Sequence, residues 1–474
     1  MLFVRKEKDK MKMTRENKMA NQPMFKLILS MSLPAMFSML IQALYNVVDS
    51  VFVSNYESAT ITGNESLLSV NIAFPLQLIL IAVSVGTGIG VNSLIARRLG
   101  AKNQQDADSA ATHGLFLGVI NWIVFVFIGI FATRPFISLY TDNTEVFNGS
   151  TMYLSIVLIG SLGATMTCVL EKTLQSTGNM MIPMCSQLTG AVINIILDPI
   201  FIYVLDMGVT GAAIATIIGQ YCSALVCLFN IFFKKQLVKI KIRGFRFNGN
   251  ILKNIYVVAL PAMVMQAIGS FMVMSINYII SIADASAVER DAATNVFGIY
   301  FKLQSFVFMP VFGLNQGSTP VMGFNYGAGN RDRLYSAVKW AMTFAVVIMA
   351  LGLAVFQLFP ELLLGMFKPN QEMIEIGKSA LRTISLCFVP AAAGIVLTGL
   401  FQAVGKGIRS LIMSILRQMV VIVPVAYFLS KISISDMWFA FPVAEFISLM
   451  VAILFFMNLV KGEFKRLVPI EENT

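Results

Sequence analysis

Long apolar stretches separated by short polar segments recur along almost the whole chain. Each stretch has about 20 residues or more, the length that a helix needs to cross roughly 30 Å of hydrocarbon. The pattern predicts twelve spans, at about 27–53, 66–90, 107–132, 151–173, 181–204, 208–233, 252–281, 292–316, 335–359, 376–402, 409–430 and 436–460. Because hydrocarbon offers no water to backbone groups, each span is expected to be a helix. The predicted fold class is therefore an all-α membrane protein with twelve transmembrane helices.

Composition agrees with this pattern, because 57% of the residues are hydrophobic, 13% are charged and the mean hydropathy is +0.76. A soluble domain is far less apolar and carries about twice that share of charge. The net charge of +10 is concentrated in polar segments on the side of the amino terminus. The lysines and arginines that fall on the other side are Arg134, Arg290, Lys368, Lys378 and Lys431. This asymmetry predicts cytoplasmic termini in a cell inner (plasma) membrane, and it accounts for the charge without a nucleic-acid partner.

The two halves of the chain repeat each other at a spacing of 227 residues. "LPAMFSM" at Leu33 returns as "LPAMVMQ" at Leu260, and Gly86 returns as Gly313. The expected organisation is a basic tail at 1–26, an amino-terminal lobe at 27–233, a cytoplasmic linker at 234–252, a carboxyl-terminal lobe at 253–460 and a tail at 461–474. Parallel repeats of this kind are typical of transporters. A duplicated receptor or scaffold is the alternative. The segment "GTGIG" lacks the strand of a nucleotide site, so we expect it to allow close helix packing.

Two acids distinguish the first half from the second. Asp49 and Asp198 lie inside spans one and five, where the second half has Ile276 and Val425. A charge within the bilayer costs a few kcal/mol, so such acids are functional candidates by default. The alternatives are that Asp198 caps a kinked helix and that Asp49 is an interfacial acid.

Other polar residues accompany these acids at helical spacing, so that those on one span share a face. They are Gln42, Tyr45 and Asn46 on span one, Asn194 on span five and Thr216 on span six. Pro199 removes a backbone donor and should loosen the helix next to Asp198. We expect one cation-coupling site here, suited to H⁺ or, at Asp49, Asp198, Asn194 and Thr216, to Na⁺.

Four further charges lie well inside spans, away from the span ends, namely Lys302, Arg382, Arg417 and Glu445. Lys302 and Glu445 both lie about ten residues from the outer face, so they are expected to form a buried pair. The sequence leaves open whether such a pair is structural or lines a substrate route, and it assigns no role to Arg382 or Arg417.

Several long motifs resemble the multidrug and toxic compound extrusion (MATE) family, in particular its DinF and MepA-like prokaryotic branch. They are "ALYNVVDSVFVS", "GTGIGVNSLIARRLGAKNQQDAD", "NIILDPIFIYVLDMGVTGAAIATIIG" and "GLNQGSTPVMGFNYGAGN". The resemblance implies a V-shaped bundle of two six-helix lobes and export of substrates in exchange for H⁺ or Na⁺. It also implies that the amino-lobe acids and their polar neighbours form the cation site. Other branches carry a Glu in span seven, which reads "PAMVMQAIGSFMVMSINY" here, so a carboxyl-lobe coupling site is not expected.

The expected function is thus secondary active multidrug efflux, with lipophilic, often cationic compounds as substrates. The expected partners are these small molecules and membrane lipids, the coupling ion takes the place of a cofactor, and the protein is expected to act as a monomer. A lipid-linked saccharide flippase of the same superfamily is the alternative. An intramembrane enzyme is disfavoured because the chain has no metal-ligand cluster and no Ser-His pairing.

Overall fold

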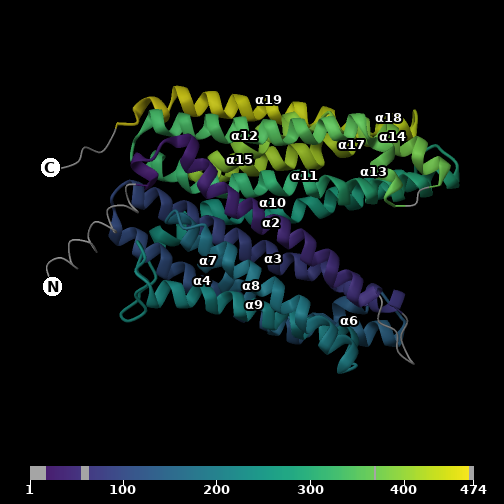
Figure 1. Cartoon of the computed structure of the whole chain (residues 1–474), viewed down its shortest axis with the longest axis horizontal. Coiled ribbons are helices and arrows are strands. Elements are labelled where there is room, and N and C mark those ends of the chain that lie inside the picture. Colours follow the sequence, from purple (N-terminus) through teal and green to yellow (C-terminus); the bar gives the residue numbers. More distant parts are fainter. Residues whose placement is uncertain (1–17, 55–62, 368–369, 469–474) are drawn as a thin grey trace. The chain divides into compact units, whose positions relative to one another are not determined.

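The structure, a computed structural model, describes residues 18–54, 63–367 and 370–468, with side chains except at 45–47, 49–51, 54, 63, 64 and 67. Every regular element in these ranges is helical (Figure 1). The first half contains α2 (Met24–Ser54), α3 (Gly63–Gly100), α4 (Gln104–Phe131), α5 (Thr133–Ile137), α6 (Thr144–Ile159), α7 (Leu162–Ser176), α8 (Met181–Pro199), the π-helix η1 (Ile200–Val204) and α9 (Gly208–Phe233). The second half contains α10 (Gly249–Ser281), α11 (Ala287–Gly327), α12 (Arg331–Leu358), α13 (Pro360–Gly365), α14 (Gln371–Ser385), α15 (Phe388–Ala403), α16 (Gly407–Ile415), the π-helix η2 (Leu416–Val421), α17 (Ile422–Ser430), α18 (Ile434–Met437), α19 (Ala440–Lys461) and the short η3 (Phe464–Arg466).

The predicted number of spans is confirmed. Within the described ranges, ten helices are long and apolar enough to cross a membrane, and two bent helix pairs bring the number to twelve. The bent pairs are α6 with α7 and α14 with α15, each with an angle of 45°. Their breaks, near Gly160 and Cys387, are themselves 227 residues apart. The duplication therefore extends to the shape of individual spans.

Two compact units divide the described chain, and each takes a half-helix from the other half of the sequence. Of the described residues, the first unit contains 18–22 and Phe37–Met263, and the second contains Pro23–Met36 together with the part of the chain from Val264 to Val468. The beginning of α2 thus packs within the second unit, where Ser32 Oγ donates a hydrogen bond to Leu314 O at 3.3 Å. The beginning of α10 packs within the first unit.

A repeated pair of glycines receives each of these half-helices. In the first unit, the first glycine pair, Gly86 and Gly90 of α3, is so close to α10 that a Cβ at Gly90 would lie 2.5 Å from Ile255 O. In the second unit, the second glycine pair, Gly313 and Gly317 of α11, meets the backbone of α2 in the same way. This confirms that "GTGIG" allows close helix packing.

The linker after α9 is fastened to α4 by side chains placed along one helix face. Asp108 Oδ1 accepts a hydrogen bond from Lys239 N at 2.9 Å, and Thr112 Oγ1 accepts one from Lys241 N at 3.1 Å. His113, which is fully buried, accepts one at Nε2 from Asn248 N at 2.8 Å. The only histidine of the chain thus has a structural role, holding the linker to α4.

Candidate functional site

Three of the predicted site residues meet inside the first unit, between α8 and α9. Asn194 Nδ2 donates to Asp198 Oδ1 at 3.1 Å and lies 3.5 Å from Thr216 Oγ1. Their side chains are almost inaccessible, since Asp198 is 0% exposed, Asn194 2% and Thr216 6%. Asn194 and Asp198 are four residues apart in one helix, so the helix itself brings amide and carboxylate together. Close packing of α8 on α9 at Gly190 and Gly219 brings Thr216 near them.

This cluster has unused capacity to bind a cation. Asn194 Oδ1 is buried and accepts no hydrogen bond from the described residues. A buried oxygen left without a partner costs about 1–3 kcal/mol, which a bound cation or proton donor would offset. Carboxylate, amide and hydroxyl oxygens are the hard ligands that an alkali cation prefers. The donor set therefore fits Na⁺, and its carboxylate also suits H⁺.

The helix changes its winding immediately after the acid. Pro199 ends α8, and the chain continues through the π-helix η1, in which Leu205 N donates to Ile200 O at 2.9 Å. Because proline has no N–H, the regular hydrogen-bond pattern cannot continue through it. Tyr203, within η1, donates from Oη to Phe52 O at 2.6 Å and so connects this segment to the end of α2. Single π turns of this kind are frequent at functional sites.

The remaining predicted residues lie on α2. Gln42 has an exposed side chain and is not joined to the cluster by a hydrogen bond that the structure describes. The backbones of Tyr45, Asn46 and Asp49 are helical, but their side chains lie outside the described residues. The participation of these residues, and the pairing of Asp49 with Asp198, stay predictions.

Sequence reasoning missed a second buried carboxylate in the first unit. Glu171 of α7 is 5% exposed, and Gln187 Nε2 of α8 donates to its Oε2 at 2.8 Å. Glu171 Oε1 and Gln187 Oε1 are both buried and without a hydrogen-bond partner among the described residues. The equivalent of Glu171 in the second half is Thr398, so the comparison that singled out Asp198 would also have found it. Glu171 lies two residues from the predicted end of span four and next to Lys172, so hydropathy alone does not distinguish it from a charge at the membrane surface.

The expected pair between Lys302 and Glu445 does not form. Glu445 Oε1 lies 3.3 Å from Arg417 Nη1 of η2, whereas Lys302 is exposed and its Nζ lies 5.9 Å from the centre of the Phe367 ring. Estimated depth in the membrane does not say which way a side chain points around its helix. Since α19 packs against η2, Arg417 is the cation that reaches the carboxylate.

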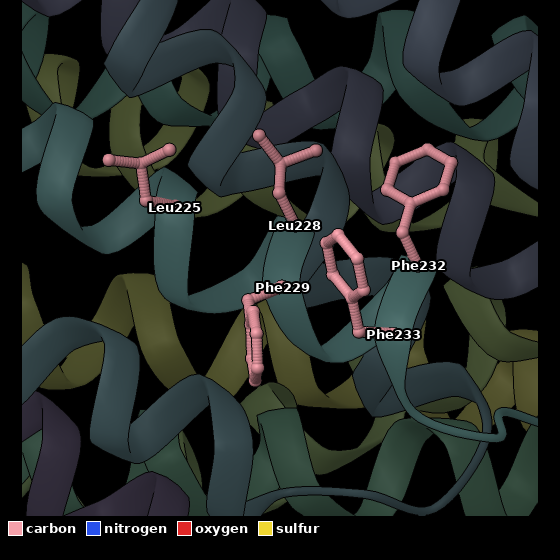
Figure 2. Close-up of a pocket in the computed structure, with 5 residues that line it drawn as sticks. All are labelled: Leu225, Leu228, Phe229, Phe232 and Phe233. Carbon is pink, nitrogen blue, oxygen red and sulfur yellow. The ribbon is translucent and has the colours of Figure 1, made fainter.

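An apolar pocket on α9 is not part of this site. Figure 2 shows its lining, which consists of Leu225, Leu228, Phe229, Phe232 and Phe233. The pocket offers no polar group, and Phe233 is 79% exposed. An exposed apolar surface of this kind on a membrane span suits contact with lipid better than binding of a charged ligand.

Comparison with known proteins identifies the family. Multidrug export protein MepA of Staphylococcus aureus (strain MRSA252) is 25% identical over 413 residues, which cover 86% of this chain and 88% of MepA. A solved structure described as the outward-facing conformation of a multidrug resistance MATE family transporter of the MOP superfamily is 28% identical, with a TM-score of 0.87, over 94% of this chain and 98% of that one.

A second solved structure warns against reading the substrate from the fold alone. It is a MOP superfamily transporter from Pyrococcus furiosus, 27% identical with a TM-score of 0.87, over 95% of this chain and 98% of that one. For that transporter, reverse polarity of the binding pocket suggests a different function. The sequence model of the MatE family matches residues 34–200 and 261–428, one segment in each half. Since these segments make up more than half of the chain, the chain belongs to the MatE family of membrane transporters.

Proposed function

We propose that the chain exports lipophilic, often cationic compounds and takes up H⁺ or Na⁺ in exchange. The observation that carries this proposal is the buried cluster of Asn194, Asp198 and Thr216, which has an unused oxygen and lies next to a π turn. The similarity to the multidrug export protein MepA and to a multidrug resistance MATE family transporter supports multidrug compounds as the substrates. Family membership already excludes the intramembrane enzyme considered from the sequence.

Coupling follows from the cost of a buried charge. An ionised Asp198 in a nearly inaccessible site is unfavourable unless a cation or proton neutralises it. Binding of the ion therefore changes the electrostatic energy of the end of α8, where Pro199 and η1 leave the backbone hydrogen bonds least regular. The hydrogen bond from Tyr203 to Phe52 gives this segment a direct mechanical connection to span one. We infer that ion binding at Asp198 shifts the balance between conformations through this connection.

The remaining parts of the proposal concern the cellular setting. The asymmetry of Lys and Arg supports a plasma-membrane protein with both termini in the cytoplasm, and the single chain carries both repeats, so we propose that a monomer is sufficient. Asp49 is proposed as the second acid of the site, together with Tyr45, Asn46 and Gln42 as its polar neighbours on α2. No cofactor is proposed beyond the coupling ion.

Asp198→Asn in proteoliposomes tests the coupling site. The amide keeps the size of the side chain but cannot ionise, so gradient-driven export of ethidium should fall to the level of empty vesicles while the protein stays folded. Asp142→Asn, which changes an exposed carboxylate of the same unit, is the matched control and should export normally. Imposing the H⁺ and Na⁺ gradients separately identifies the coupling ion. Uphill export by a folded Asp198→Asn protein would show that coupling takes place elsewhere.

A further inference from the structure

The ion pair between Arg417 and Glu445 is a further, partly buried charge site, and it belongs to the second unit alone. At the spacing of 227, its equivalents in the first half are Gly190 and Ile218. There, α8 packs on α9 through glycine, and a Cβ at Gly190 would lie 3.0 Å from Gly219 O. The same pair of spans therefore packs in the first half without an ion pair at these positions. The fold of the repeated unit does not require the ion pair.

Arg417 and Glu445 also make fewer hydrogen bonds with each other than an ion pair that serves stability would be expected to make. It has a single contact of 3.3 Å, although a guanidinium and a carboxylate can form two parallel hydrogen bonds. No second hydrogen bond joins the two side chains, and Glu445 Oε2 and the remaining donors of Arg417 are not among the fully buried polar atoms that lack a partner. The neighbouring Gln418 Oε1 is buried and lacks a partner among the described residues. A buried ion pair that serves stability needs these groups satisfied, because desolvation of both charges is costly.

The carboxylate borders free space, and its partner lies in a π-helix. The Arg417 side chain is 24% exposed and the Glu445 side chain 12%. Two glycines keep bulk away: a Cβ at Gly394 of α15 would lie 3.9 Å from Glu445 Oε2, and one at Gly269 of α10 would lie 3.6 Å from Gln418 Oε1. Arg417 is in the π-helix η2, where the hydrogen-bond pattern is less regular than in an α-helix. Arg417 can therefore leave Glu445 without unfolding a span.

We propose that Glu445 binds the positive group of a lipophilic-cation substrate, and that Arg417 occupies this carboxylate when no substrate is bound. The inference rests on the proposed export function and names the residue that recognises charge. Arg417 neutralises Glu445 when no substrate is bound. A substrate cation displaces the Arg417 guanidinium from the carboxylate toward solvent, to which this side chain is already partly exposed. Neutral substrates do not need this exchange. In this proposal Glu445 of the second unit recognises the charge of the substrate, whereas Asp198 of the first unit binds the coupling ion.

Equilibrium binding of tetraphenylphosphonium to the purified full chain tests this proposal without any gradient. Glu445→Gln should weaken binding about tenfold or more, the size of effect that loss of one close charge partner has in other interfaces. Arg417→Gln should strengthen binding, because the competing cation is gone. A purely structural pair would give the opposite sign, since an unpaired Glu445 would disturb the unit. Thermal midpoints and gel filtration establish that each variant is folded.

Lys406→Gln is the matched control, since Lys406 is the cation of an ion pair with Glu463 in the same unit at 2.6 Å. It removes the same charge from a more exposed pair and should leave binding unchanged. If it strengthens binding as much as Arg417→Gln does, the effect is general electrostatics and the proposal fails. If Arg417→Gln does not fold, Arg417→Lys carries the test, because its weaker hold on the carboxylate should still raise affinity.

Unchanged or weaker binding in a folded Arg417 variant, or unchanged binding in Glu445→Gln, would overturn the proposal. Failure of the export function is recognised separately, because it appears as loss of gradient-driven export by the wild-type protein. Normal export of a neutral substrate by Glu445→Gln would agree with the proposed division between charge recognition and coupling.

Discussion

Replacing Gly313 by alanine tests whether the second glycine pair determines how closely α2 approaches α11. A Cβ at this position would lie 2.5 Å from Met36 Cα and 2.6 Å from Met36 N. Ordinary contacts begin near 3.4 Å, so the half-helix must move away by about 1 Å, since backbone atoms cannot rotate aside. Overpacking of this kind costs about 1–3 kcal/mol.

Gly298→Ala in the same helix is the matched control, because a Cβ there meets no atom within 4 Å. Both changes gain the same helix propensity, about 1 kcal/mol, so the difference between the two variants isolates the clash. Thermal unfolding in detergent should give Gly313→Ala the lower midpoint, by about 2–4 °C for each kcal/mol in a unit of roughly 200 residues. Equal midpoints would refute the close approach.

Three further outcomes are expected. Glu171→Gln should keep the protein folded, since glutamine can still accept from Gln187, but should reduce gradient-driven export in proteoliposomes; unchanged export would leave Glu171 a structural residue. In a background without native cysteines, an impermeant thiol reagent on intact cells should label Asp142→Cys and not Arg246→Cys, because the charge asymmetry places them on opposite sides; equal labelling would contradict the topology. His113→Phe removes the acceptor for Asn248 N at a cost of about 1 kcal/mol, so trypsin should cut the linker faster than in the wild type, and an unchanged rate would mean that the other contacts to α4 suffice.

Hydropathy and repetition were sufficient to predict most of the fold. The spans follow from the length of apolar stretches, and the role of Gly86 and Gly90 follows from glycine at a four-residue spacing within a span. The 45° bends near Gly160 and Cys387 could not be predicted, because neither break contains a proline. Such bends depend on how neighbouring helices pack.

The candidate site was predictable in part, for a physical reason that differs between residues. Asn194 and Asp198 share a helix, so their contact follows from spacing alone. The partner of Glu445 lies on another helix, and predicting it requires knowing how each helix is rotated about its axis. Successive side chains on a helix point in directions that differ by about 100°. Depth alone could therefore place Lys302 and Glu445 at one level without making them partners.

The exchanged half-helices have a consequence for the two copies of the repeat. Each half carries one half-helix and one glycine pair, and each glycine pair receives the half-helix of the other half. A single copy of the repeat would carry both parts, so two copies of it could exchange their half-helices as domain-swapped dimers do. In one chain this exchange is internal, and it leaves the two copies free to differ elsewhere, as they do at Asp198 and Glu445.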